Sequence, residues 1–102
     1  MIHVLATVEL KSGRREDFLS EFHKIVPLVR QEKGCVEYGP AIDTATDISA
    51  QGRLRENVVV VIEKWENLPA LEAHLIAPHM LEYRGKVKEM VARTQLQILE
   101  PA

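Results

Sequence analysis

Five consecutive β-branched residues, Val58 to Ile62, constrain the fold of this chain more than any other stretch. β-branched side chains pack well on a pleated strand and are less favourable in a helix. Successive side chains of a strand point to opposite faces, so an unbroken apolar run needs cover on both sides of its sheet. We therefore expect a central strand over 57–65, in a sheet that has two covering layers.

Hydrophobic periodicity predicts the other elements. Strands are expected over 2–10, 35–42 and 94–100, and helices over 14–33, 68–76 and 78–93. Ser12 is a plausible N-cap for the first helix and Gly34 its terminator, while Asn67 is placed to cap the second helix. Pro40 indicates a bulge or an edge strand. The segment 43–56 contains turn formers without a period and is expected to be a mobile loop.

The predicted order, β-α-β-β-α-α-β, is typical of a ferredoxin-like split βαβ arrangement in the α+β class, with helices on one face of a four-stranded antiparallel sheet. The 102 residues suffice for a single domain, which we assign to residues 1–102. One copy supplies helices for one face only. Because the third strand is apolar on both faces, we expect a second copy to cover the other, giving a homodimer.

Composition excludes several classes of partner. The formal net charge of −2 and the scattered basic residues argue against nucleic acid and against an anionic membrane surface. No apolar run approaches the ~20 residues that a membrane span needs, and the N-terminus lacks the pattern of a signal peptide. A single cysteine, Cys35, excludes an intrachain disulfide and fits a reducing compartment. We expect a cytoplasmic protein.

Side chains suited to catalysis concentrate after the central strand. Glu63 and Trp65 share one face of that strand. His74 borders the apolar stripe of the following short helix, so it can face the space between helix and sheet. Because histidine titrates near neutrality, we interpret His74 as a catalytic base, with Glu63 as the nearest carboxylate to hold its tautomer. The alternative is a histidine on a helix shoulder, hydrogen-bonded to nearby backbone.

Five residues are candidates for substrate binding. His79 begins a helix and lies four residues before Tyr83, so the two share a face. Tyr38 is the other tyrosine, and either hydroxyl could bind a substrate oxygen. Trp65 could line a pocket for a flat ring or simply belong to the core. Together with Glu63, these residues are our candidate substrate-binding set. The histidine spacing fits no zinc pattern, and no glycine-rich phosphate or dinucleotide motif is present, so we expect neither metal nor cofactor.

The spacing Glu63-x-Trp65-x5-Leu71-x2-His74-x4-His79 resembles the antibiotic biosynthesis monooxygenase family, small proteins that form dimeric α+β barrels. The segment from Val26 to Tyr38 also resembles the end of the family's first helix and its second strand. The resemblance implies two sheets paired face to face, often with the last strand reaching the partner. Members include cofactor-free monooxygenases of quinols and polyketide phenols, haem-degrading enzymes, and an isomerase of a phosphorylated sugar derivative.

Two branches of the family fit poorly. Haem-degrading members use an asparagine of the first strand, and residues 2–10 contain none. Polyketide-oxidising members pair an asparagine with a tryptophan of the third strand. Here the positions that share a face with Trp65 are Val59, Val61 and Glu63, and the only asparagine of the strand is Asn57 at its start. The residues Trp65, His74 and His79 are more similar to the quinol monooxygenase branch or the isomerase.

From this resemblance we expect a cofactor-independent monooxygenase that oxidises a small quinol or phenol with O2, with His74 as base. Two alternatives stay open. One is an isomerase of a small phosphorylated ketone that uses His74 as a proton shuttle. The other is a non-catalytic dimer that binds a small aromatic molecule.

Overall fold

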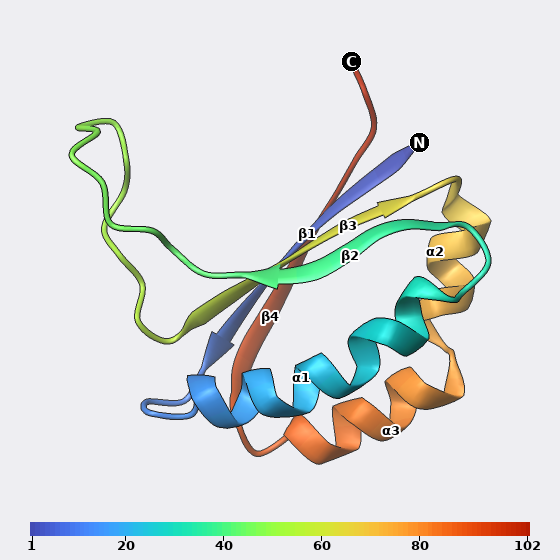
Figure 1. Cartoon of the computed structure of the whole chain (residues 1–102), viewed down its shortest axis with the longest axis horizontal. Helices are drawn as coiled ribbons and strands as arrows, with labels where there is room; N and C mark the ends of the chain where they lie inside the picture. The colour runs from blue at the N-terminus through green and yellow to red at the C-terminus, as the bar shows by residue number, and fades with distance from the viewer.

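Four antiparallel strands form one sheet in the order β2-β3-β1-β4, and three helices cover one of its faces (Figure 1). The computed structural model describes residues 1–102. The strands are β1 (Ile2–Leu10), β2 (Cys35–Ala41), β3 (Val58–Trp65) and β4 (Val91–Leu99). The helices are α1 (Arg15–Arg30), α2 (Leu68–Leu75) and α3 (Pro78–Val87). The expected ferredoxin-like order is confirmed.

The strand that carries the β-branched run lies inside the sheet, as expected, because β3 pairs with β2 on one side and β1 on the other. The register pairs Ala6 with Val61, and β4 adds Leu96 on the far side of Ala6. Alternation then points Val59, Val61 and Trp65 toward the helices, where all three are buried. This face of the sheet forms one wall of the core.

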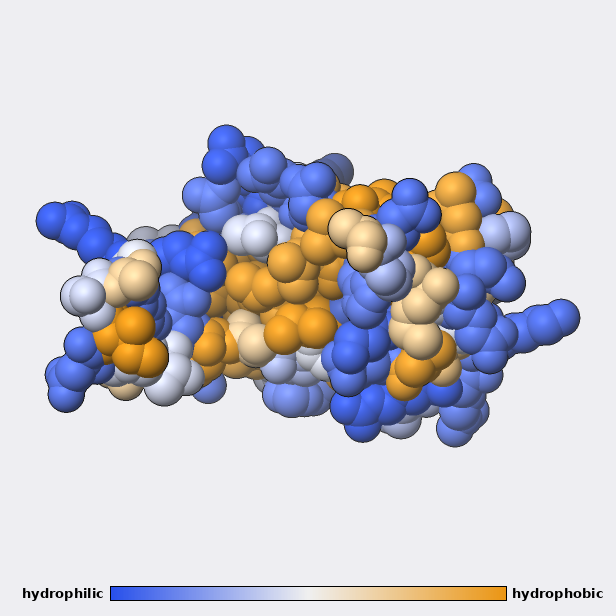
Figure 2. Space-filling model, turned by 90° about the horizontal axis from the view of Figure 1, so that it is seen from above, coloured by the Kyte–Doolittle hydropathy of each residue, from blue (hydrophilic) through white to orange (hydrophobic).

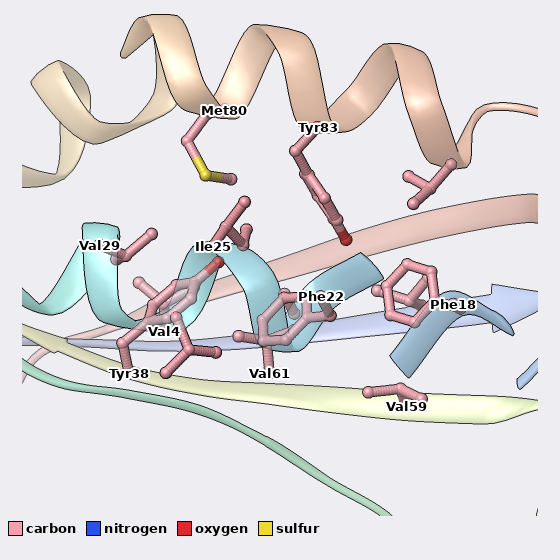
Figure 3. Packing of buried hydrophobic residues seen from close by; sticks show 14 of the residues in the cluster. Val4, Phe18, Phe22, Ile25, Val29, Tyr38, Val59, Val61, Met80 and Tyr83 are labelled. Atoms are coloured by element: carbon pink, nitrogen blue, oxygen red, sulfur yellow. The ribbon is translucent and has the colours of Figure 1, made fainter. Parts of the chain in front are cut away.

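An aromatic cluster joins the helices to the sheet. Phe18 and Phe22 of α1 stack with ring centroids 5.8 Å apart, and Phe22 stacks on Tyr38 of β2 at 5.5 Å. Tyr83 of α3 meets Phe22 edge to face at 5.8 Å. In Figure 3, Tyr83 and Met80 reach from α3 toward the side chains of α1 and the sheet. Aromatic pairs contribute ~0.5–1.5 kcal/mol each beyond the area they bury, so this cluster fixes the separation of the layers.

The ends of two helices differ from the prediction. The third helix ends at Val87, not near residue 93, and Val91 is already part of β4. Val91 pairs with Leu10, so the pairing needs of β1 override the helical pattern there. The first helix ends at Arg30, three residues before the expected end. None of the helices is long and apolar enough to cross a membrane.

Predictions at turns and caps gave mixed results. Asn67 caps α2 as expected, accepting a hydrogen bond from the Ala70 N–H at 3.0 Å. Ser12 is not a cap: Arg14 occupies the N-cap position of α1 and makes no capping bond. Pro40 lies on β2, an edge strand, where its missing N–H is tolerated. The irregularity in this strand lies between Cys35 and Glu37, away from Pro40.

The face of the sheet away from the helices has no cover within this chain. Leu5 and Ile62 are direct partners on that face and remain 39% and 38% exposed. Seen from above, this side of the molecule has an apolar area in its middle, between hydrophilic margins (Figure 2). This chain therefore does not supply the second layer that we expected over the β-branched run.

The segment between β2 and β3 forms a loop that extends away from the rest of the molecule (green in Figure 1). The Asp43 carboxylate ties its two ends together. It accepts hydrogen bonds from the Arg55 guanidinium at 2.8 and 2.9 Å and from the Arg55 backbone N–H at 2.9 Å. The predicted loop is confirmed, and its mobility stays a prediction.

Candidate active site

One carboxylate oxygen joins two histidines that belong to different helices. Glu32 lies in the turn that follows α1. Its Oε2 is 2.9 Å from Nδ1 of His74 in α2 and 2.7 Å from Nε2 of His79 in α3. An ionised carboxylate only accepts hydrogen bonds, so each imidazole donates an N–H to it. The orientation of both rings is therefore set by Glu32.

Gly34 lets this turn lie close to α2. Its φ of +85° is in the region that favours glycine, and an added Cβ would lie 2.6 Å from the Cβ of Ala70 in α2. The Gly34 carbonyl also accepts the N–H of Glu66, 2.8 Å away, just before α2 begins. These contacts place Glu32, two residues earlier, beside His74.

His74 is almost completely buried, with 2% of its surface exposed. The bond from its Nδ1–H to Glu32 leaves Nε2 without a proton in the neutral ring. Burial lowers the pKa of His74, and the hydrogen bond and charge of Glu32 only partly oppose this. The neutral ring, with Nε2 free to accept a proton, is thus the favoured form near neutral pH.

The second carboxylate of the site, Glu63, faces Nε2 of His74 without bonding to it. The distance from Glu63 Oε1 to His74 Nε2 is 3.9 Å, too long for a hydrogen bond. The expectation that Glu63 holds the tautomer of His74 is therefore wrong, because Glu32 does so. Glu63 Oε1 instead accepts the indole N–H of Trp65 at 2.9 Å.

Burial raises the pKa of Glu63 to about 7, against the lowering effect of the Trp65 hydrogen bond, and the negative charge of Glu32 adds to the rise. Near neutral pH, Glu63 is therefore present in both protonated and ionised forms. A group of this kind can give or take a proton at little cost. Strongly shifted groups that lie in a cavity are candidates for function.

A cavity of about 460 Å³ lies between the helices and the sheet, within the size range of small-molecule sites. Most of its wall is apolar. Four buried polar residues also line it: Tyr38, Glu63, His74 and Tyr83. Burial raises the pKa of both tyrosines, so their hydroxyls stay neutral donors. The loop between β2 and β3 contributes nothing to this wall.

Two predicted binding residues lie outside the cavity. Trp65 does not line it, contrary to expectation. It is fully buried behind His74, with the two ring centroids 4.7 Å apart. His79 also lies outside the wall, beside a smaller groove of about 120 Å³ between α1 and α3 that Tyr83 also lines. The structure thus brings together His74, Glu63, Tyr38 and Tyr83, and places Trp65 and His79 behind or beside them.

Glu32, the carboxylate that binds His74, is a residue that the sequence analysis did not propose. It is 42 positions from His74, and no pattern connects the two. In the sequence, Glu32 was indicated only by its place in the segment before Tyr38 that resembles the family. No group of three or more His, Cys, Asp or Glu side chains is arranged to hold a metal ion. What the arrangement can do is acid–base chemistry at one end of an apolar cavity.

The fold and site define a class: small ferredoxin-like proteins with an apolar cavity under the helices and a buried imidazole between two carboxylates. Within it, the chain belongs to the antibiotic biosynthesis monooxygenase family, whose model matches residues 1–86. It is similar to a protein of Escherichia coli described as "Probable quinol monooxygenase YgiN", with 40% identity over 103 residues, 99% of this chain and 98% of the relative.

Solved structures show the same fold at lower identity. PA3566 from Pseudomonas aeruginosa superposes with a TM-score of 0.81 at 22% identity, over 99% of this chain and 93% of that one. Rv0793 from Mycobacterium tuberculosis gives 0.79 at 24% identity, over 99% and 94% of the two chains. The expected family and fold are confirmed.

Proposed function

We propose that this protein is a monooxygenase that oxidises a small quinol or phenol with O2, without a bound cofactor, and that His74 is its base. The observation that carries the proposal is the position of His74 at the wall of an apolar cavity, with Nδ1 bonded to Glu32. This bond leaves Nε2 of the neutral ring to accept a proton. The description of the Escherichia coli relative supports a quinol as the substrate class.

The first step is removal of a hydroxyl proton by Nε2 of His74. The imidazolium that forms is stabilised by the Glu32 carboxylate, 2.9 Å from Nδ1. The substrate anion is rich in electrons and transfers one to O2, after which a C–O bond forms on the ring. Loss of water then leaves a hydroxyquinone. Quinol plus O2 gives hydroxyquinone plus water, so the quinol supplies all the electrons and no external reductant is needed.

The other polar groups of the wall orient the substrate. In its protonated form Glu63 donates a hydrogen bond to a substrate oxygen, and the neutral hydroxyls of Tyr38 and Tyr83 do the same. The apolar remainder of the cavity excludes water from the anion and the oxygen intermediates. His79 and Trp65 act through Glu32 and Glu63 and do not touch the substrate.

We also propose that the working form is a homodimer in which the uncovered faces of two sheets pack together. The support is the pair Leu5 and Ile62, exposed in the middle of the face away from the helices. A domain of this size buries only about two-thirds of its chain surface, so a partner would add to its core.

The deciding experiment follows O2 consumption by purified, chelator-treated, colourless protein with a panel of quinols. We expect uptake of one O2 per quinol, well above the rate without protein, with a hydroxyquinone as product. Uptake equal to spontaneous oxidation across the panel would reject the monooxygenase. Conversion of a phosphorylated ketone without O2 uptake would identify the isomerase alternative instead, and binding without any turnover would indicate the non-catalytic alternative.

A further inference from the structure

The cavity has two chemically different ends. Glu63 and His74 are buried and form one end. The exposed lining residues are Arg84 and Lys88 from α3 and its C-cap, and Thr94 and Leu96 from β4. Since solvent reaches the cavity only where its lining is exposed, the mouth lies between α3 and β4.

The two cations at the mouth have no counter-charge. Arg84 and Lys88 are four residues apart and so project from the same side of the helix. Neither takes part in a salt bridge or a side-chain hydrogen bond within the chain, whereas Lys86 on the same helix pairs with Glu82 at 3.4 Å. The only acidic residue in the cavity wall is Glu63, at the buried end. Two positive charges therefore face the mouth without a partner.

The charge of Arg84 acts into the cavity. It lowers the pKa of His74, adding to the larger effect of burial, and it opposes the burial-driven rise in the pKa of Tyr83. A guanidinium that influences both groups is near enough to attract an anion seated in the same space. Lys88 adds a second positive charge at the mouth.

We infer that the natural substrate is an aromatic quinol or phenol that carries a carboxylate. The ring occupies the apolar middle, the reacting hydroxyl faces His74, and the carboxylate lies between Arg84 and Lys88. This deepens the proposed function by naming the substrate class, and the binding part of the inference holds whether or not O2 is consumed.

A carboxylate fits this mouth better than a phosphate. The guanidinium of Arg84 can bind either anion with two parallel hydrogen bonds, so the choice rests on the helix end. Phosphate sites usually use a helix N-terminus, where free N–H groups and the dipole favour negative charge. Here the mouth is at the C-terminal end of α3, where the dipole disfavours the higher charge of a phosphate.

The test compares two ligands of nearly equal shape that cannot be oxidised as quinols, 2-naphthoate and 2-naphthamide, by calorimetry at low salt. Two charge-assisted contacts at a partly exposed site should make naphthoate bind roughly ten-fold more tightly than naphthamide. The double variant R84Q/K88Q should bind both ligands equally. The control Lys86→Gln removes one positive charge from the same helix, outside the cavity wall, and should keep the full preference.

Each outcome decides a separate point. Equal binding of the two ligands to the unaltered protein, binding of neither, or an unchanged preference in R84Q/K88Q would overturn the inference. A lowered melting temperature in R84Q/K88Q, with the preference for naphthoate intact, would show that the two cations only stabilise the C-terminal end of α3. Tighter binding of 2-naphthyl phosphate than of 2-naphthoate would overturn the choice of carboxylate. Preference for naphthoate without O2 uptake from any carboxylated quinol would keep the anion site and reject the monooxygenase.

Discussion

At the scale of residues, the two carboxylates of the site differ because their donors differ. Glu32 receives N–H donors from both His74 and His79, and its side chain is 14% exposed. Glu63 is 6% exposed and receives one donor, the indole of Trp65, with no cation bonded to it. An ionised carboxylate needs several donors to replace lost water. This shortage leaves the pKa of Glu63 raised to about 7.

The first prediction follows from this shift. The pKa of Glu63 rises from 4.5 to about 7 on folding, so between these values the folded state binds more protons than the unfolded state. Stability therefore falls as pH rises through that window, by on the order of 3 kcal/mol for the whole shift. Glu63→Gln cannot ionise and should lose this fall. Urea unfolding from pH 5 to 8 should show the variant gaining stability relative to the parent as pH rises.

His74 makes stability depend on pH in the opposite direction, and it does so in both the parent and Glu63→Gln. Because its pKa is lowered on folding, its contribution to stability falls as pH decreases below its ordinary value of 6.5. The difference between parent and Glu63→Gln cancels this effect. A difference that stays constant from pH 5 to 8 would show that Glu63 does not titrate in this window.

The second prediction concerns the imidazole and its carboxylate. His74→Ala should lower turnover by ~10²–10⁴-fold, the usual contribution of a positioned base, and abolish the rise of rate with pH. Glu32→Gln keeps an acceptor but removes the charge that raises the pKa of His74. The rise of its pH–rate curve should therefore move to lower pH, with a lower plateau and little change in KM.

His79→Ala is the companion variant, since it removes the other donor to Glu32 while leaving His74 in the cavity wall. It should reduce turnover less than His74→Ala does. If Glu32→Gln retains both the parent rate and the parent pH curve, Glu32 has no positioning role, whatever its contribution to stability.

His74, Glu63 and both tyrosines could be proposed from the sequence because strand alternation and helix spacing determine which face a side chain occupies. Glu32 could not, because its contact with His74 depends on how a turn packs against a distant helix. Trp65 shares a strand face with Glu63 and yet lies outside the cavity. The ring of His74 covers it, which periodicity cannot show.

At the scale of elements, the turn between α1 and β2 connects the site to the packing of α2. The third prediction tests this with Gly34→Ala. An alanine there must adopt a φ of +85° and push against Ala70, whose Cβ would be 2.6 Å away. Backbone strain and overpacking each cost ~1–3 kcal/mol. We expect a clear loss of stability in urea unfolding, together with reduced turnover because Glu32 lies in the same turn.

Gly13→Ala is the matched control. Gly13 has a similar φ of +77°, but an added Cβ would meet nothing within 4 Å. It should show the backbone cost alone, and the activity should be unchanged. Ala70→Gly combined with Gly34→Ala should recover part of the loss. Equal destabilisation by Gly34→Ala and Gly13→Ala would mean that the contact with α2 is unimportant.

The sequence predicted that each helix and strand exists, but it predicted less well the residues at which they begin and end. The β-branched run and the alternating segments identified every strand. The end of α3 could not be predicted, because Val91 continues the apolar spacing of Val87 and only its pairing with Leu10 of β1 removes it from the helix. Ser12 resembled a cap, but the positive φ of Gly13 lets the helix begin after Arg14.

At the scale of the whole molecule, the uncovered sheet face is the main unsatisfied surface. The fourth prediction is that sedimentation gives about twice the chain mass at micromolar concentration. Ile62→Lys, placed in the middle of that face opposite Leu5, should shift the equilibrium to monomer. Leu81→Lys is the control. Leu81 is 57% exposed on α3, a helix that covers the opposite face of the sheet.

A parent protein that sediments as a monomer would reject the sheet-to-sheet dimer. A dimer that survives Ile62→Lys but dissociates in Leu81→Lys would place the interface on the helical side instead. The melting temperatures of Ile62→Lys and Leu81→Lys should be measured together with their sedimentation, because loss of a partner also lowers apparent stability.

The loop tied by Asp43 and Arg55 has a consequence for how such a protein can diversify. The loop follows Ala41 and ends before Val58, and no part of it reaches the cavity. Doubling the length of such a loop adds only ~0.6 kcal/mol of closure entropy. Descendants could therefore acquire a longer insertion here, even a docking segment for another protein, while the chemistry under the helices stays as it is.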